Sequence, residues 1–321
     1  MERKTVGGKA LQKTPEGAKP KFDWKRDFRA NGTLYLLFTP VLAYFIIFNY
    51  LPMFGLVMAF QDFRPARGFL GSTWVGLDNF TEFMTHPDFL NILRNTVVMS
   101  VLGLVVGMVT AILYTLLLNE LKYSKFKRPV QTISYLPHFL AATVVAGMII
   151  DFTSSNGVIT NFLVRFFGMD RQNMLMNPRF FWGIHVVSGV WTGLGFSSII
   201  YLASLGNVNP ELHEAAAIDG ANRLRRAWHI TLPALQPVII TMLILNMGML
   251  MNVGADRILL IYNPTIFSTA DVINTHVFRM GVERMQFGYS SAVGLFNSVV
   301  GTTLLLVTNF ISRKMSEYAI F

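Results

Sequence analysis

The residues best suited to chemistry lie in a polar segment, 214–233, between two strongly apolar segments. It contains Glu214, Ala215 and Ala216, then Gly220, and it ends in Ile-x-Leu-Pro. A carboxylate beside a face of small alanines suits close approach by another protein and an ion pair with an arginine of that protein. The chemistry that this segment predicts is therefore the docking of a partner.

The same segment has a predictable local structure. Pro210 can open a helix, and the residues from Glu211 to Asp219 favour one, with acids near its positive N-terminal end. Gly220 suits the left-handed position that closes a helix. A second helical stretch is expected from about Asn222, and it carries Arg223. We expect two short helices outside the membrane; an amphipathic helix resting on lipid head groups is the alternative.

Catalytic chemistry is not predicted for this chain. It has no G-x-x-x-x-G-K-[ST] motif and no cysteine, and His213–Glu214 is not part of an H-E-x-x-H zinc motif. No nucleophile, base and orienting group occur as a set. The chain is expected to be no enzyme, with no catalytic residue, no metal site and no cofactor of its own.

Three polar residues within the apolar segments are candidates for a substrate pathway. Asn246 and Arg257 would share one helical face at a spacing of eleven residues, and Asn297 lies on the polar face of the last apolar segment. Charge inside a bilayer is costly and often functional. For Arg257, snorkelling to the interface or pairing with Asp256 are the alternatives. For Asn297, the alternative is a hydrogen bond between helices.

Small residues recur at intervals of four in two of the apolar segments. Gly103 and Gly107 form one such pair, and Gly189 and Gly193 form another. Small residues at this spacing allow membrane helices to approach closely. We expect these glycines to serve helix packing.

The composition is typical of a membrane protein. Hydrophobic residues make up 52% of the chain and charged residues 14%, and the mean hydropathy is +0.45. Apolar runs long enough to span a bilayer occur six times. We therefore expect an all-α membrane protein with six transmembrane helices, at 34–60, 96–118, 130–150, 180–202, 238–262 and 289–311.

The basic residues are distributed unevenly between the two sides that these helices define. Eighteen of the 27 lie in the termini and in the connections 119–129 and 204–237. Eight lie in the other three connections, and Arg257 lies within a span. Positive charge prefers the cytoplasm. We expect both termini and the polar loop to be cytoplasmic, and the net charge of +9 to report topology rather than nucleic-acid binding.

The expected domain organisation is simple. Residues 1–33 are Lys-, Gly- and Pro-rich and are expected to form a flexible basic cytoplasmic tail. They do not have the pattern of a cleavable signal peptide. Residues 34–321 are expected to form one transmembrane domain that includes the polar loop at 204–237.

The polar segment resembles the EAA loop of ATP-binding-cassette importer permeases. Several further runs are similar to sugar-type members of that family, in the branch that imports oligosaccharides and polysaccharide fragments. Within that branch, the chain as a whole closely resembles permeases of bacterial alginate importers. These runs are LPMFGLVMAFQDF at 51–63, WVGLDNF at 74–80, NTVVMS at 95–100, LLLNEL at 116–121, QTISYLPHF at 131–139, YLASL at 201–205, VGLFNSVVG at 293–301 and NFISRK at 309–314.

This resemblance implies a type I importer permease fold with cytoplasmic coupling helices between the fourth and fifth spans. It implies a bacterial inner-membrane location and four kinds of partner besides lipid: a second related permease, two ATPase subunits that hold ATP and Mg, an external solute-binding protein and an oligosaccharide or polysaccharide. Glu214, Ala215, Ala216, Asp219, Gly220 and Arg223 would contact the ATPase. An acidic cargo such as alginate is expected; a neutral oligosaccharide and a stand-alone secondary transporter are the alternatives.

Overall fold

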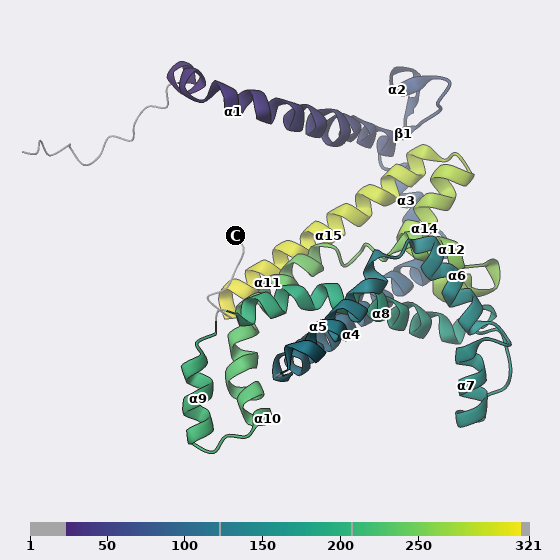
Figure 1. Cartoon of the computed structure of the whole chain (residues 1–321). Helices are drawn as coiled ribbons and strands as arrows, with labels where there is room; N and C mark the ends of the chain where they lie inside the picture. The colour runs from purple at the N-terminus through teal and green to yellow at the C-terminus, as the bar shows by residue number, and fades with distance from the viewer. Residues whose placement is uncertain (1–23, 122, 207, 316–321) are drawn as a thin grey trace, which may run out of the picture. The chain divides into compact units, whose positions relative to one another are not determined.

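The computed structural model describes residues 24–315 except 122 and 207. The chain forms two compact units, residues 1–55 and residues 56–321. Apart from one short pair of strands, every regular element that the structure describes is helical (Figure 1).

The first unit contains α1, Trp24–Phe45, which continues into a π-helical segment at Ile46–Tyr50. Asn31 departs from helical geometry, with φ −116° and ψ 19°, and Pro40 lies inside the helix. The last ten residues of the predicted tail, 24–33, are thus helical, and the rest of the tail lies outside the described residues. The helical course from Asp27 to Phe60 is long and apolar enough to cross a membrane.

The second unit contains the remaining helices and a two-stranded antiparallel sheet in which Gln61 pairs with Trp74. Its strands are β1, Gln61–Asp62, and β2, Thr73–Trp74. Its α-helices are α2 Gly68–Gly71, α3 Asp78–Thr85, α4 Phe89–Glu120, α5 Ser124–Tyr135, α6 Ala142–Thr153, α7 Val158–Phe167, α8 Pro178–Leu205, α9 Pro210–Ile218, α10 Arg223–Arg226, α11 Leu232–Gly248, α12 Ala255–Ile261, α13 Phe267–Ala270, α14 Ile273–Phe278 and α15 Phe287–Met315.

Six helical stretches in the described residues are long and apolar enough to span a membrane, as the sequence predicts. The third begins later than expected. The prediction placed it at 130–150, but α5 ends at Tyr135 and a 3-10 turn at Leu136–Phe139 follows. Pro137 in that turn has no N–H to donate, which interrupts the helix. The candidate span is Ala142–Phe167, and it comprises α6 and α7 with a turn between them.

The fifth span also differs from the prediction of one helix at 238–262. The candidate span is Arg223–Gly248, and α11 ends at Gly248. The chain then turns, and α12 begins only at Ala255. Gly248 and Gly254 flank this turn, and glycine weakens a helix because it gains the most freedom on unfolding. Asn246 and Arg257 therefore lie on separate helices, and the predicted shared helical face is wrong.

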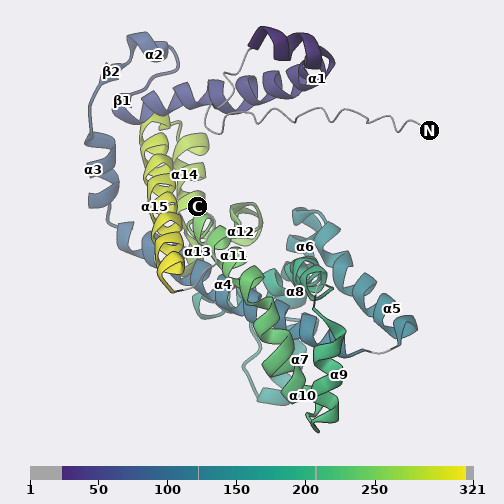
Figure 2. The same ribbon diagram turned by 90° about the vertical axis from the view of Figure 1, so that its left-hand side faces the viewer.

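The hydrophobic core follows α4 and α8, which pack along each other. One buried cluster joins Phe181 of α8 to Ile149 of α6 and Ile258 of α12. Another joins α3, α14 and α15. Figure 2 shows α14 and α15 side by side. A third, around Leu235, joins α4, α8 and α11. The four helices α4, α8, α11 and α12 thus form the frame of the inner cavity described below.

Candidate coupling loop and substrate cavity

Helix α9 begins where the sequence predicts. The Asn209 side chain accepts a hydrogen bond from the backbone N–H of Glu211 at 3.0 Å, and Pro210 occupies the first turn. An N-terminal amide acceptor satisfies one of the N–H groups that a helix start leaves free, and proline has none to satisfy. The short helix is therefore well defined at its start.

Gly220 closes α9 with a left-handed turn. Its φ is +81°. The N–H of Ala221 donates to the carbonyl of Ala216 at 2.9 Å, and the N–H of Gly220 donates to the carbonyl of Ala217 at 3.2 Å. These two hydrogen bonds define a Schellman motif, in which glycine is favoured because it has no Cβ. The predicted conformation of Gly220 is confirmed.

The second helix of the loop differs from the prediction of a separate short helix. Asn222 caps α10, accepting from the N–H of Arg225 at 2.8 Å. From there the chain is helical through a π turn at Ala227–Thr231 into α11, without a break at Pro233. Pro233, which has no N–H to donate, lies two residues after the π turn, so it is inside this continuous helix. The loop is thus a helical hairpin whose second arm extends the fifth span (Figure 1).

The two arms of this hairpin lie side by side in both ribbon views, and the Arg226 guanidinium donates to the carbonyl of His213 at 3.4 Å. Most of the predicted docking residues are exposed there, and Ala216 is half-buried. The exposed ones are Glu214, Ala215, Asp219, Gly220 and Arg223.

Four large apolar side chains are exposed on the same hairpin: Leu212, Ile218, Leu224 and Trp228. Ile218 is 87% exposed and Leu224 is 77% exposed, and both lie next to the Gly220 turn. Clustered exposed apolar residues mark interaction surfaces. These four residues were not predicted from the sequence, although an apolar residue on each side of a polar turn is a visible signal.

A cavity of about 420 Å³ lies between α4, α8, α11 and α12. Asn246 and Arg257 both line it, so the structure brings these two predicted residues together although they lie on different helices. Aromatic side chains of α8, Phe196 and Tyr201, form part of the wall. An apolar hollow with a few polar groups is the usual form of a small-ligand site.

Arg257 is half-buried and reaches α8, where its guanidinium donates to the carbonyl of His185 at 3.4 Å. Its Nε has no hydrogen-bond partner among the described residues. Gly189 faces the guanidinium so closely that an added Cβ would lie 3.3 Å from it. The side chain is therefore directed into the cavity, and Asp256, which is exposed, forms no ion pair with it.

A smaller hollow of about 250 Å³ adjoins this cavity and shares His185 and Asn246 with it. Ser100 and Asn252 line this second hollow. The Ser100 hydroxyl and the His185 Nδ1 are buried without a hydrogen-bond partner among the described residues. Buried polar groups are normally paired, so these two atoms mark places where a polar ligand or water would be stabilised.

Asn297 does not line the main cavity. It borders a third hollow of about 250 Å³, together with Asn252. Its amide donates to Asn274 at 3.3 Å, and the Asn274 amide donates to Asn252 at 2.5 Å. A row of asparagines therefore links Asn297 to the hollow beside Asn246, and this row was not foreseen from the sequence.

The prediction that the glycine pairs serve close helix packing is wrong within this chain. A Cβ added at Gly103, Gly107 or Gly193 would meet nothing within 4 Å, and these three residues line the main cavity with Gly189. They widen the space between α4 and α8. Tight approach occurs elsewhere, at Gly195, where an added Cβ would lie 2.1 Å from the carbonyl of Ser134.

A buried polar cluster fixes the connection that carries α13 and α14. Asp271 pairs with Arg279 and accepts from the hydroxyl of Thr275 at 2.8 Å. The Asn95 amide of α4 donates to the carbonyl of Asp271 at 3.0 Å, and the Thr96 hydroxyl accepts from the N–H of Ile273 at 2.9 Å. These bonds anchor the connection to α4. Arg279 and Asp271 were not singled out from the sequence, since they lie in a loop.

Comparison with known proteins places this architecture in a family. Residues 103–317 match the model of the binding-protein-dependent transport system inner membrane component. The chain is 41% identical over 288 residues to the polygalacturonan/rhamnogalacturonan transport system permease protein YteP of Bacillus subtilis (strain 168), covering 90% of each protein. It is 40% identical to Protein LplB of the same organism over 93% of this chain and 94% of that protein.

Solved structures agree. A chain in the crystal structure of a bacterial alginate ABC transporter, in complex with an alginate pentasaccharide-bound periplasmic protein, matches with a TM-score of 0.84 and 37% identity. The match covers 92% of this chain and 99% of that chain. A second crystal structure, of a bacterial ABC transporter involved in the import of the acidic polysaccharide alginate, matches with a TM-score of 0.82 and 37% identity over 90% of this chain and 98% of that chain. The predicted type I permease fold is confirmed, and the chain belongs to the family of inner membrane components of binding-protein-dependent transport systems.

Proposed function

We propose that this chain is a permease subunit of an ATP-driven importer for an acidic oligosaccharide, with alginate fragments as the first candidate cargo. The observation that carries the proposal is the position of Arg257. Its guanidinium lies in a cavity with the Asn246 amide and with Phe196 and Tyr201 in the wall. Guanidinium groups bind carboxylates, and flat aromatic and amide groups suit the faces and hydroxyls of a sugar ring.

The relatives support an acidic cargo. The matching solved transporters handle alginate, and YteP is named for polygalacturonan and rhamnogalacturonan. A permease named for arabinooligosaccharides is more distant, at 28% identity. Because YteP is 41% identical, a galacturonan fragment is the second candidate cargo.

The partners follow from the exposed hairpin of α9 and α10. We assign its exposed carboxylate, Glu214, and its exposed apolar residues, Ile218 and Leu224, to docking on a cytoplasmic ATPase subunit. A pair of such ATPases would bind ATP and Mg. A second related permease would complete the membrane pathway, and an external solute-binding protein would deliver the sugar.

The mechanism requires no acid or base in this chain. Closure of the ATPases on ATP would move the docked hairpins. Because α10 runs without a break into α11, this movement would be passed directly to a helix that lines the cavity. Rocking of helix bundles around a fixed site gives alternating access.

The experiment that tests this proposal is reconstitution of the chain with its partners in liposomes. Alginate oligosaccharides loaded on the binding protein should stimulate ATP hydrolysis and accumulate inside. Galacturonan oligosaccharides test the second candidate, and neutral arabino-oligosaccharides are the control. Stimulation by the neutral sugar alone would overturn the acidic cargo and leave the family assignment intact.

A further inference from the structure

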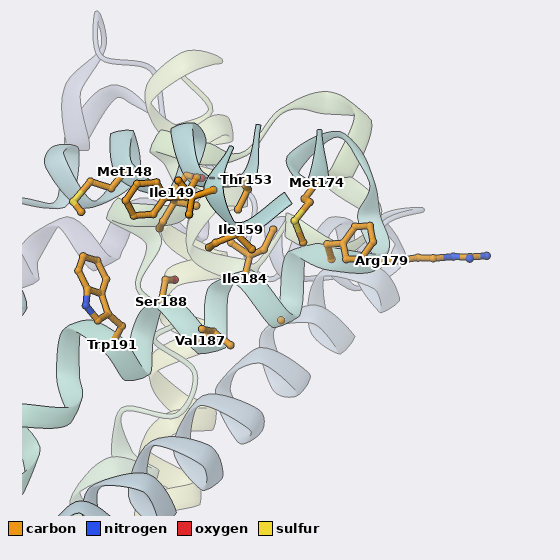
Figure 3. A pocket seen from close by; sticks show the side chains of 14 residues that line it. Met148, Ile149, Thr153, Ile159, Met174, Arg179, Ile184, Val187, Ser188 and Trp191 are labelled. Carbon is orange, nitrogen blue, oxygen red and sulfur yellow. Dashed lines mark hydrogen bonds between the residues drawn. The ribbon is translucent and has the colours of Figure 1, made fainter. Parts of the chain in front are cut away.

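A second large hollow lies away from the cavity of Arg257, between α6, α7 and α8. It is a groove of about 570 Å³, larger than the main cavity. Figure 3 shows its lining, which is dominated by apolar side chains such as Ile149, Ile159 and Ile184. The volume falls within the range of roughly 300–1,000 Å³ that is typical of small-ligand sites.

The hydroxyl groups in the groove are already used by the protein. Thr153 donates to the carbonyl of Ile149 at 2.6 Å, and Ser188 donates to the carbonyl of His185 at 3.0 Å. A sugar in this groove would lose its hydrogen bonds with water and find few replacements, which is costly. The groove therefore suits an apolar occupant.

One end of the groove is cationic. Arg179 is one of the lining residues at this end, and its side chain points away from the other lining side chains (Figure 3). Among the described residues, no carboxylate forms an ion pair with Arg179. An occupant with an apolar body and an anionic end would match both parts of this site.

The length of the groove matches one leaflet of a bilayer. Along α8 it extends from Arg179, in the first turn, to Trp191 at the other end (Figure 3). Twelve residues of helix rise roughly 18 Å, and half of a bilayer's hydrocarbon core is roughly 15 Å. Arg179 lies at the opposite end of α8 from the α9–α10 hairpin, so under the proposed topology this is the outer leaflet.

An extended hydrocarbon chain fits an apolar groove of this length, and Arg179 at one end supplies the cation with which an anionic lipid head group would pair. We propose that this groove holds one acyl chain of a phospholipid whose phosphate pairs with Arg179.

The test uses phosphatidylglycerol that carries a photoreactive group on one acyl chain, added to the complete transporter in liposomes. After irradiation, label should appear in peptides that contain residues 148–159 and 183–191. Unlabelled phosphatidylglycerol should compete about tenfold better than diacylglycerol with the same acyl chains, as expected for one charge-assisted contact. Inorganic phosphate alone should not compete.

Two variants separate the two halves of the site. Gly183→Phe fills the groove, because a Cβ at Gly183 meets nothing within 4 Å, and it should reduce the label about tenfold. Gly147→Phe on α6 is the matched control, since that position is equally open but lies outside the groove, and its label should be unchanged. Arg179→Gln, at an exposed position, should abolish the advantage of phosphatidylglycerol over diacylglycerol.

Three results would overturn the proposal. Equal labelling of the wild type and Gly183→Phe would mean that lipid contacts only the outer surface. Loss of label in Gly183→Phe with no effect of Arg179→Gln would remove the phosphate contact. Absence of label in the complete transporter, with cross-linking of a cysteine at Val187 to the second permease, would assign the groove to a protein partner.

Discussion

Arg257 combines burial with an incomplete set of hydrogen bonds. Among the described residues, its guanidinium donates a hydrogen bond to the carbonyl of His185 at 3.4 Å, and its Nε is left unpaired. A half-buried cation of this kind is costly unless something binds it during the working cycle. Cargo carboxylates are the partner that the proposed function supplies.

Arg257→Ala should therefore reduce transport of an acidic oligosaccharide more than Arg257→Lys does. Lysine keeps the charge but loses the planar fork. Loss of a charge-assisted contact of about 1.5–3 kcal/mol corresponds to roughly a tenfold to hundredfold weaker response. Cargo-stimulated ATP hydrolysis, measured beside assembly of the complex, is the readout. Equal stimulation of the wild type and the Ala variant would remove Arg257 from the pathway.

His276 is a buried titratable group outside the membrane spans. Its Nε2 lies 2.9 Å from the Tyr289 hydroxyl and its Nδ1 lies 3.2 Å from the Arg279 guanidinium. The pKa of His276 is lowered to about 4, mainly by burial and also by Arg279 and His86, while Asp271 and Asp88 act in the opposite direction. Below pH 6.5 the unfolded chain would therefore bind a proton that the folded chain does not, and stability falls as the pH falls towards 4.

This effect predicts a loss of about 2 kcal/mol near pH 5 relative to pH 7.5. The melting temperature of the purified complex should fall over this interval. His276→Gln cannot titrate, so its melting temperature should fall less, even if it starts lower at pH 7.5. The same fall in both proteins would show that another group is responsible.

For single residues, the sequence predicts a conformation correctly where neighbouring residues determine it. The left-handed conformation of Gly220 follows from its position after a helix-forming stretch, and the structure confirms it at φ +81°. The prediction of a packing role for Gly103 and Gly193 failed, because glycines at this spacing are compatible both with helix packing and with the wall of a cavity. Only the positions of α4 and α8 in space decide between these two roles. The asparagine row through Asn274 likewise depends on the placement of α14 and α15.

Among the elements, the hairpin of α9 and α10 depends most on one backbone conformation. Gly220→Val should distort it, because a β-branched residue at φ +81° is strained by about 1–3 kcal/mol. Gly220→Asn should be milder, since asparagine tolerates this region. The measurement is coupling, the ratio of sugar transported to ATP hydrolysed. Indistinguishable coupling in the Val and Asn variants would argue against a role for this turn.

Glu214 provides a separate test of the same element. It is exposed and forms no ion pair among the described residues, so its replacement should leave the isolated chain stable. Glu214→Lys should weaken capture of the ATPase subunit by about 3–5 kcal/mol if the carboxylate is buried against an arginine there. Glu211→Lys, one turn earlier on α9, is the control for the change of charge; because Glu211 accepts a hydrogen bond from the Asn209 amide at 3.2 Å, the helix content of this variant is measured as well. Undiminished capture by Glu214→Lys would contradict the docking role.

The elements were predictable in number and type because long apolar runs dominate the sequence. Their ends were not. The fifth span stops at Gly248 and α12 starts at Ala255, yet hydropathy is continuous across this turn. The sequence pattern thus concealed the break that places Arg257 on a separate short helix. Packing of Ile258 into the core with Phe181 fixes that helix, and such contacts are not visible in the sequence.

For the whole molecule, the distribution of basic residues predicts which side of the membrane each loop faces. The predicted six-span topology puts eighteen basic residues on the side of the α9–α10 hairpin and eight on the other side, and the positive-inside preference then predicts a cytoplasmic hairpin. The ATPase-docking role and the outer-leaflet lipid site both depend on this orientation. The alternative orientation would leave the hairpin without access to ATP.

Single cysteines test the orientation directly, because the chain contains none. A membrane-impermeant thiol reagent applied to intact spheroplasts should label cysteines placed at Thr73 and Asp170, which are exposed in two of the three outer connections. It should label cysteines at Thr5 and Ser124 only after the membrane is permeabilised. Ser124 is exposed at the start of α5, so a lack of labelling there before permeabilisation would reflect sidedness rather than burial. The reverse pattern would invert the topology and place the hairpin outside the cell.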